Sequence, residues 1–291
     1  MANIIWTGLV LGSVYALVAT GFTIAMVPTG VFNFAQGAIV VAGTFFTYQF
    51  LSVSGVATGW TLALTTLIGA GAGLLCEVLT VRPLRWARGS VDNAMVTTVG
   101  ASTAIIGLVG ANWGYVPLLV PFHGPSGFLH LLGAVTTPIQ IITVGSAIAA
   151  ALGFEALFRF TRRGQACLAV AEDRDPAMLR GVNVSTLSIA AFSAAGAFGG
   201  LAGFIIGPTT YADASLGATL ALYGFVAAAF GGQGSFAGGL AGGFVVGIVA
   251  TFASTYLGAN YSDLAVLVLL LVTLGLRPQG LGKGGAHARI V

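Results

Sequence analysis

The chain has 291 residues, of which 57% are hydrophobic and 7% are charged, and its formal net charge is +3. A soluble globular domain carries about 25% charged residues, so this chain could not cover its own surface in water. The composition excludes a soluble protein and predicts an all-α, polytopic membrane protein. The small positive charge is explained by membrane topology and does not indicate nucleic-acid binding. We expect one membrane domain over residues 1–291.

Nine apolar segments approach the length of about 20 residues that a transmembrane helix needs. They cover about 4–26, 31–51, 60–81, 94–112, 137–158, 186–207, 217–235, 237–257 and 262–276. The seventh and eighth are the weakest, because the stretch that joins them, Gly231–Gly239, fits either a tight turn or a break within a half-helix. We therefore predict about eight or nine transmembrane helices.

Glycine is unusually common, with 44 residues in the chain. In a membrane, small residues spaced four apart let two helix backbones approach closely. Such pairs predict helix contacts at Gly8/Gly12, Gly69/Gly73, Gly196/Gly200, Gly203/Gly207, Gly239/Gly243 and Gly243/Gly247.

The basic residues gather in three regions, 82–88, 159–180 and 277–289. Cytoplasmic loops are enriched in lysine and arginine, so all three regions are predicted to be cytoplasmic. An even number of predicted spans separates each region from the next, as this assignment requires. Three spans precede the first region, which places the N-terminus outside and the C-terminus in the cytoplasm.

The longest predicted external segment, 113–136, is rich in proline and glycine and suits a loop with a short interfacial helix. Its two histidines, His123 and His130, have no cysteine or carboxylate beside them, so we expect no metal site. Cys76 lies in an apolar span and Cys167 in a charged loop, and we expect no disulfide between them.

The stretch GVFNFAQG, residues 30–37, places Asn33 and Gln36 one helical turn apart between two apolar segments. Unsatisfied polar groups are costly in hydrocarbon, so this face must point into the helix bundle. In one interpretation the two amides hydrogen-bond neighbouring helices. In the other they line a substrate path beside a helix that is broken at Pro28 and Gly30.

The depth of this stretch in the membrane stays open, because Pro28–Gly30 fits either a cytoplasmic turn or a break in mid-span. Weaker candidates for the same path are Tyr15, Thr23, Thr44, Thr97, Thr98 and Ser102. The ionisable residues in or near the spans are Glu77, Asp92, Glu155, Asp213 and Asp263. Most of them fall near span ends, and we interpret Glu77 and Glu155 as locally paired with Arg82 and Arg159.

The predicted cytoplasmic loop 159–183 is more structured than a simple connection. Gly164–Glu172 is compatible with a helix, and Asp173 or Asp175 can cap a second short helix with Pro176 at its first position. Met178 and Leu179 would give that helix an apolar side, and Gly181 would end it. Such a helix pair fits a docking element for a partner protein, although a generic loop is the alternative.

The sequence has no GxxxxGK[ST] phosphate loop, no HExxH and no GxSxG motif. We therefore predict that the chain is not an enzyme and does not itself hydrolyse ATP.

Several of these stretches resemble one family in order along the chain. They are Gly8–Phe45, the loop from Gly164 through Glu172 to Asn183, Ala194–Pro208, Val226–Gly243 and Arg277–Leu281. Together they resemble the LivH/LivM permeases of branched-chain amino-acid ABC importers, and the chain is closer to the LivH type of subunit. Two positions depart from the family pattern: Gln36 replaces a histidine and Ala38 replaces a glutamate.

The resemblance implies an ABC importer permease fold and a translocation path for branched-chain amino acids or a related small solute. Asn33, Gln36, Tyr15, Thr23, Thr44, Thr98 and Ser102 would line that path. It also implies coupling to ATPases through Glu172, Asp173, Arg174, Asp175 and Gly181. The expected partners are a LivM-like permease, two cytoplasmic ATP-binding subunits, an external substrate-binding protein and the lipid of a bacterial inner membrane. No cofactor is expected on this chain, since the partner subunits would use the ATP. A stand-alone channel or secondary transporter is the alternative.

Overall fold

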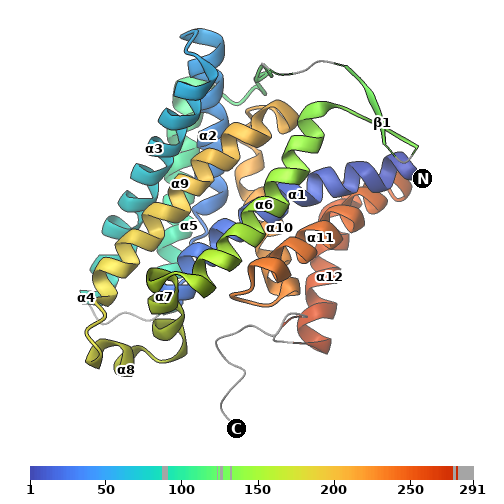
Figure 1. Cartoon of the computed structure of the whole chain (residues 1–291). Helices are drawn as coiled ribbons and strands as arrows, with labels where there is room; N and C mark the ends of the chain where they lie inside the picture. Colours follow the sequence, from blue (N-terminus) through green and yellow to red (C-terminus); the bar gives the residue numbers. More distant parts are fainter. Residues whose placement is uncertain (87–90, 123, 125–126, 132, 278–279, 281–291) are drawn as a thin grey trace. The chain divides into compact units, whose positions relative to one another are not determined.

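The computed structural model describes residues 1–86, 91–122, 124, 127–131, 133–277 and 280 (Figure 1). Its helices are α1 (Ala2–Thr29), α2 (Gln36–Tyr48), α3 (Thr58–Cys76), α4 (Arg82–Trp86), α5 (Val91–Trp113), α6 (Pro138–Phe160), α7 (Arg162–Glu172), α8 (Arg174–Leu179), α9 (Val184–Thr210), α10 (Leu216–Gly231), α11 (Phe236–Tyr256) and α12 (Ser262–Leu276). Shorter elements are the π-helical turns Gln49–Val53 and Glu77–Val81, a 3-10 turn at Ala259–Tyr261 and the strands β1 (Leu129–Leu131) and β2 (Ala134–Thr136).

Eight helices within the described residues are long and apolar enough to cross a membrane. The helix α10, with 16 residues, is a shorter apolar helix. The prediction of an all-α polytopic protein is therefore confirmed, and each of the nine predicted segments overlaps one of these helices. Between α10 and α11 the chain makes a tight turn, with positive φ at Gly232 and Gly234, and Ser235 caps the new helix by accepting a hydrogen bond from Gly238 N.

The prediction of an interfacial helix in the external segment is wrong for the described residues, where β1 and β2 form a small antiparallel hairpin. Gly133 turns the chain with a φ of +83°. The side chains of α1 hold the second strand: Asn3 accepts a hydrogen bond from Val135 N, and Trp6 donates one to Thr136 Oγ1. Contacts distant in sequence thus decide the local structure. His123 lies outside the described residues.

The chain divides into two compact units. The first unit comprises Met1–Thr23, Phe122–Ala156 and Leu222–Val291, and the second comprises Ile24–Pro121 and Leu157–Ala221.

In the first unit, α1 and α11 pack through glycines at a backbone-to-backbone contact. A Cβ on Gly12 would lie 2.7 Å from the carbonyl oxygen of Gly243, and a Cβ on Gly243 would lie 2.7 Å from that of Gly12. Gly8 and Gly247 meet in the same way one turn away. The predicted contacts of these glycine pairs are confirmed.

In the second unit, α2, α3, α5 and α9 lie side by side (Figure 1). The predicted Gly69/Gly73 and Gly196/Gly200 pairs face each other, because a Cβ on Gly69 would collide with the carbonyl oxygen of Gly196. On α2, a Cβ on Gly43 would lie 3.0 Å from the carbonyl oxygen of Gly200. Close backbone packing of three helices therefore forms a rigid support for the segment that precedes α2.

Candidate functional site

The chain between α1 and α2 is irregular, and it is buried except at the exposed Gly30 and the half-buried Phe34. Pro28 lies in the last turn of α1, where it does not interrupt the helix, and Gly30 ends that helix with a φ of +70°. The side chains of Asn33 and Gln36 are 0% exposed. Non-helical backbone at membrane depth is tolerated only where protein or a water-filled cavity surrounds it. We call residues 30–35 the first break.

Asn33 uses half of its amide to shape the first break. Its Oδ1 accepts a hydrogen bond from Ala35 N (3.2 Å), and its carbonyl oxygen accepts one from Gln36 N (2.9 Å), which starts α2. Its buried Nδ2 makes no hydrogen bond within the described part of the chain.

Gln36 bonds α2 to a neighbouring helix. Its Nε2 donates a hydrogen bond to the carbonyl oxygen of Ala195 in α9 (3.0 Å), whereas its buried Oε1 has no hydrogen-bond partner among the described residues. An unpaired buried polar atom costs about 1–3 kcal/mol, and folded proteins contain few of them. Hydrogen bonds within the fold thus use one polar atom of each amide, Asn33 Oδ1 in its own turn and Gln36 Nε2 to α9. The donor Asn33 Nδ2 and the acceptor Gln36 Oε1 remain available to bind a solute.

Thr98 of α5 holds the first break from a third helix. Its Oγ1 accepts a hydrogen bond from Phe34 N (3.2 Å) and lies 2.7 Å from the carbonyl oxygen of Met95 and 3.4 Å from that of Phe32. Of the predicted path residues, Asn33, Gln36 and Thr98 are the ones that the second unit brings together at this break.

The neighbouring helices fix the depth of the first break. Gln36 lies beside Ala195, the twelfth of the 27 residues of α9, and Phe34 lies beside Thr98, the eighth of the 23 residues of α5. At a rise of 1.5 Å per residue, these positions are about 16 Å and about 10 Å from the starts of the two helices. The break is therefore level with the interior of two candidate spans rather than with their ends, which favours a position within the membrane over a cytoplasmic turn.

The loop between α6 and α9 forms a second feature built by local sequence. Thr161 caps α7 by accepting a hydrogen bond from Gly164 N (3.0 Å). Asp173 directly precedes α8, so Pro176 is the third residue of that helix. The prediction that Pro176 would be its first residue is wrong. The start after Asp173 places α8 two residues earlier than a start after Asp175 would, and proline is tolerated anywhere in a first turn because those N–H groups have no helical acceptor.

Gly181 ends α8 as predicted. It has a φ of +87°, its N–H donates to the carbonyl of Met178 (2.9 Å), and the N–H of Val182 donates to the carbonyl of Ala177 (3.2 Å). This pair of bonds is a Schellman motif, which requires a residue with left-handed backbone. Val170, Ala177 and Val184 form a small buried cluster that fixes the loop to the start of α9. Leu179, in contrast, is 90% exposed and Met178 is 46% exposed.

The family model for "Branched-chain amino acid transport system / permease component" matches residues 4–274. The chain belongs to this family. It is 29% identical to the "High-affinity branched-chain amino acid transport system permease protein LivH" of Escherichia coli (strain K12), covering 95% of this chain and 93% of that protein. It is 26% identical to the corresponding permease BraD of Pseudomonas aeruginosa, over 94% and 93% of the two chains. No solved structure matches.

The remaining predicted path residues of this permease lie apart from the first break or are bonded within their own helix. Thr44, buried in α2, donates to the carbonyl of Val41 (2.7 Å), and Ser102 is half-buried one turn after Thr98. In the first unit, Thr23 donates to the carbonyl of Ala19 (2.9 Å), and Tyr15 packs edge-on against Tyr223 with ring centroids 4.8 Å apart. Their role in a substrate path stays a prediction.

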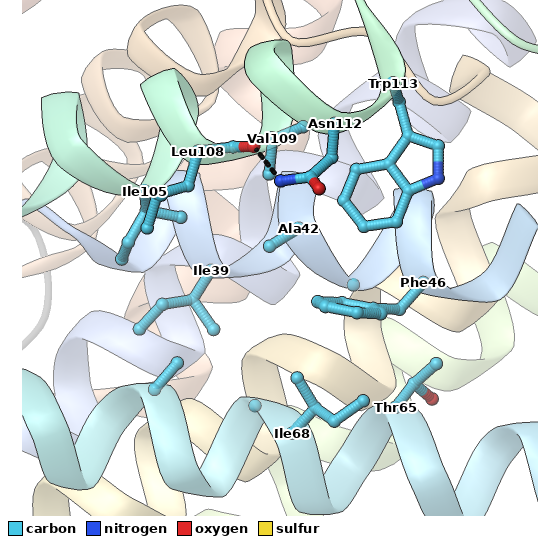
Figure 2. A pocket seen from close by; sticks show the side chains of 13 residues that line it. Ile39, Ala42, Phe46, Thr65, Ile68, Ile105, Leu108, Val109, Asn112 and Trp113 are labelled. Carbon is cyan, nitrogen blue, oxygen red and sulfur yellow. Dashed lines mark hydrogen bonds between the residues drawn. The ribbon is translucent and has the colours of Figure 1, made fainter. Parts of the chain in front are cut away.

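A pocket of about 400 Å³ lies between α2, α3 and α5 of the permease (Figure 2). It is lined by Ile39, Ala42, Gly43, Phe46, Thr65, Ile68, Gly69, Ala72, Ile105, Leu108, Val109, Asn112 and Trp113. Asn112 and Thr65 donate to carbonyls of their own helices, and the pocket contains none of the predicted path residues. Its lining suits an apolar group and offers nothing for a charged one.

Two carboxylates have partners that sequence spacing did not indicate. Glu77, in a π-helical turn after α3, is 0% exposed and accepts a hydrogen bond from Ser188 of α9 (3.1 Å). Asp263 of α12 accepts one from the hydroxyl of Tyr223 (2.5 Å). Both partners are far away in sequence. The only sign of them in the sequence is that each is a polar residue within an apolar helix.

Proposed function

We propose that the chain forms part of the translocation path of an ATP-driven importer for branched-chain amino acids or a related small solute. Family membership over residues 4–274 supports a transport permease. The observation that carries the proposal further is the first break, where the Asn33 donor and the Gln36 acceptor are buried and unpaired inside an apolar bundle. A polar solute that passes the break can bond to both.

Binding at the first break would be weak, which suits a path. The two amides are neutral, and a hydrogen bond between neutral groups contributes about 0.5–1.5 kcal/mol. Conduction requires that a solute can leave as well as enter. Selectivity in this proposal comes from an external binding protein that delivers the solute.

The chain would receive its energy from two cytoplasmic ATPases and would bind no cofactor itself. The α7–α8 loop supports this role because Leu179 is almost fully exposed at the end of α8, and the charged Glu172, Asp173 and Arg174 are exposed where that helix begins. In this proposal Leu179 is the apolar contact that a partner ATPase covers. Asp175 and Gly181 complete the proposed coupling loop. Closure of the ATPases on ATP would move this loop and change the access of the path.

The proposal includes a second, LivM-like permease and the inner membrane of a bacterium, with the N-terminus outside and the C-terminus in the cytoplasm. The test is affinity purification of the tagged chain from its native membrane in mild detergent, followed by mass spectrometry. Two P-loop ATPases and a second permease are expected. A chain that purifies alone as a stable self-oligomer, and that transports without ATP after reconstitution, would instead be a stand-alone channel or secondary transporter.

A further inference from the structure

The sequence around the first break recurs once, 180 residues later. Residues 28–38 read PTGVFNFAQGA, and residues 208–218 read PTTYADASLGA. The proline, the threonine and the final Gly-Ala pair are identical, and Asp213 stands where the first copy has Asn33. Residues 211–215 connect α9 to α10, and we call them the second break.

The backbone geometry of the second break repeats that of the first. Asp213 Oδ1 accepts a hydrogen bond from Ser215 N (2.8 Å), and the carbonyl oxygen of Asp213 accepts one from Leu216 N (3.3 Å). Asn33 makes the same two bonds to the residues two and three positions later. A residue with positive φ also ends the preceding long helix in both copies, although one position apart in the alignment: Gly30 (+70°) lies three residues before Asn33, and Tyr211 (+63°) lies two before Asp213.

Tyr211 makes this similarity more than a common turn. It is the only described residue other than glycine with positive φ, and its ψ of 169° places it in a region that is populated almost entirely by glycine. Strained backbone of this kind persists where the surrounding structure holds it in place, and it clusters at functional sites. Here the bridge between Ala212 and Leu118, with two backbone hydrogen bonds of 2.9 Å, fixes the adjoining residue.

The two copies meet within the second unit. A Cβ on Gly37 would lie 2.6 Å from the carbonyl oxygen of Gly217, so the first turns of α2 and α10 cross at the paired glycines. Both copies also touch α5: Thr98 bonds to Phe34, and the side chain of Ile106 lies against Gly217. Thr98 and Ile106 are eight residues apart, about 12 Å along the helix. The breaks therefore lie on either side of one crossing point.

We expect the copies to run in opposite directions through the membrane. Among the candidate spans α1 is the first, α2 the second and α9 the sixth, so, where each of them crosses, α9 runs in the direction of α2 and against α1. The contacts agree, because Gln36 lies beside Ala195 and Thr44 lies beside Gly207, further along both helices. In transporters with inverted repeats, solute sites lie at the interface of the repeats, between discontinuous helices.

The two breaks differ in charge. At the first break both amides are neutral: Asn33 Nδ2 is an unpaired donor and Gln36 Oε1 an unpaired acceptor, and the N-terminus of α2, which has no acidic residue in its first turn, is what favours a carboxylate group there. At the second break the half-buried carboxylate of Asp213 has one oxygen bonded to Ser215 N and no ion pair within the described residues. Asp213 lies just past the end of α9, and a half-buried carboxylate that has no counter-ion among the described residues attracts a cationic group.

We propose that Asp213 forms a second, acidic station of the path, the inverted counterpart of Asn33, and that it binds the ammonium group of an α-amino acid. In this proposal the first break binds the carboxylate group of the same solute. This inference rests on the proposed function and adds to it a reason why a zwitterion, rather than a neutral amide, is carried.

The test is leucine uptake by the complete importer, reconstituted in proteoliposomes with its ATPases and binding protein. Asp213→Asn and Asp213→Ser retain an oxygen for the Ser215 bond but remove the charge, and Asp213→Glu retains the charge. We expect both neutral variants to lower uptake by at least about tenfold, the scale of one hydrogen bond to a charged group. Asp213→Glu should keep most of the uptake. The matched control is Asp92→Asn, which removes an exposed carboxylate from the first turn of α5.

Uptake by Asp213→Asn at the wild-type level would make Asp213 a helix cap only and would overturn the inference. Equal loss in the glutamate and asparagine variants, or a failure of the neutral variants to assemble, would assign the residue to folding and also overturn it. A charge exchange sharpens the result: Asn33→Asp combined with Asp213→Asn should recover uptake relative to Asp213→Asn alone. If the wild-type complex carries no leucine or contains no ATPase, the proposed function fails, whatever the Asp213 variants do.

Discussion

In the proposed path, Asn33 and Gln36 would each serve both the fold and the function. One half of each amide makes the hydrogen bond that the fold needs, either to the turn before α2 or to α9. The other half is buried without a partner in the described structure. A residue retained only for stability would gain from an apolar side chain of the same shape, since burial of an unpaired polar atom is unfavourable.

This argument predicts the effect of Gln36→Leu. The variant loses the bond to Ala195 but also removes the unpaired Oε1, so the free energy of unfolding should change by less than about 1.5 kcal/mol. Uptake of leucine by the reconstituted importer should fall by about tenfold, because the path loses its acceptor. Thermal unfolding in detergent and uptake are measured on the same preparations.

The control for Gln36→Leu is Thr47→Val in the same helix. Thr47 is equally buried, and its hydroxyl donates only to the carbonyl of Gly43. Its replacement should leave uptake within about twofold of wild type, because a bond within one helix contributes about 1 kcal/mol to stability and nothing to the path. If Gln36→Leu instead lowers stability and leaves uptake intact, the amide only stitches helices.

At the scale of elements, the α7–α8 loop exposes one apolar side chain, Leu179, and buries others against the start of α9. Val170, Ala177 and Val184 fix the loop to the start of α9, and the Schellman motif at Gly181 sets the direction of the chain after α8. Leu179 takes no part in this packing. A loop that is rigid and exposes a leucine can transmit force from a partner.

Leu179→Asp should therefore separate docking from folding. The side chain is 90% exposed, so the variant is expected to insert and unfold like the wild type. If Leu179 is an anchor of the proposed contact, a buried charge in its place costs about 2 kcal/mol or more, which predicts at least about tenfold less ATPase recovered with the permease. Leu179→Met is the conservative control and should bind normally. Full recovery of ATPases with the aspartate variant would show that the partners dock elsewhere.

The elements that the sequence predicts well are those governed by local rules. Apolar runs of helical length mark the spans, and glycines four apart mark contacts such as Gly12 against Gly243. The end of α8 at Gly181, which has left-handed backbone, is predictable because this glycine comes directly after a short helical stretch. What local rules miss depends on distant partners. The hairpin at β1 and β2 forms on Asn3 and Trp6, more than a hundred residues earlier, and the Gln36 bond crosses 159 positions to Ala195.

The candidate site could be predicted only in part for the same reason. The spacing of Asn33 and Gln36 places both on an inward face, but it does not show which atoms are satisfied. Thr98 looks like any threonine of an apolar helix until the structure places its hydroxyl against Phe34 N. The correspondence of Asp213 with Asn33 is visible in the sequence, yet a short match of this kind acquires meaning only when both copies form the same turn.

At the scale of the whole molecule, charge and span parity together predict a topology. The positions of the arginine-rich regions predict that the α7–α8 loop faces the cytoplasm and that the connection between α2 and α3 faces outside. The proposed contact with ATPases depends on this orientation, since ATP is cytoplasmic. Ser54, in that outer connection, and Leu179, in the loop, are both exposed and thus report on opposite sides.

Cysteine labelling in intact cells tests the orientation with little background. Both native cysteines are buried, and burial raises the pKa of the Cys167 thiol to about 11. The thiolate is the reactive form, so Cys167 stays protonated and unreactive near neutral pH and becomes reactive only as the pH approaches that value. A membrane-impermeant maleimide at pH 7 should label Ser54→Cys in intact spheroplasts, whereas Leu179→Cys should react only after the membrane is opened. The opposite pattern would place the α7–α8 loop outside, where no ATPase could reach it, and the importer assignment would fall with it.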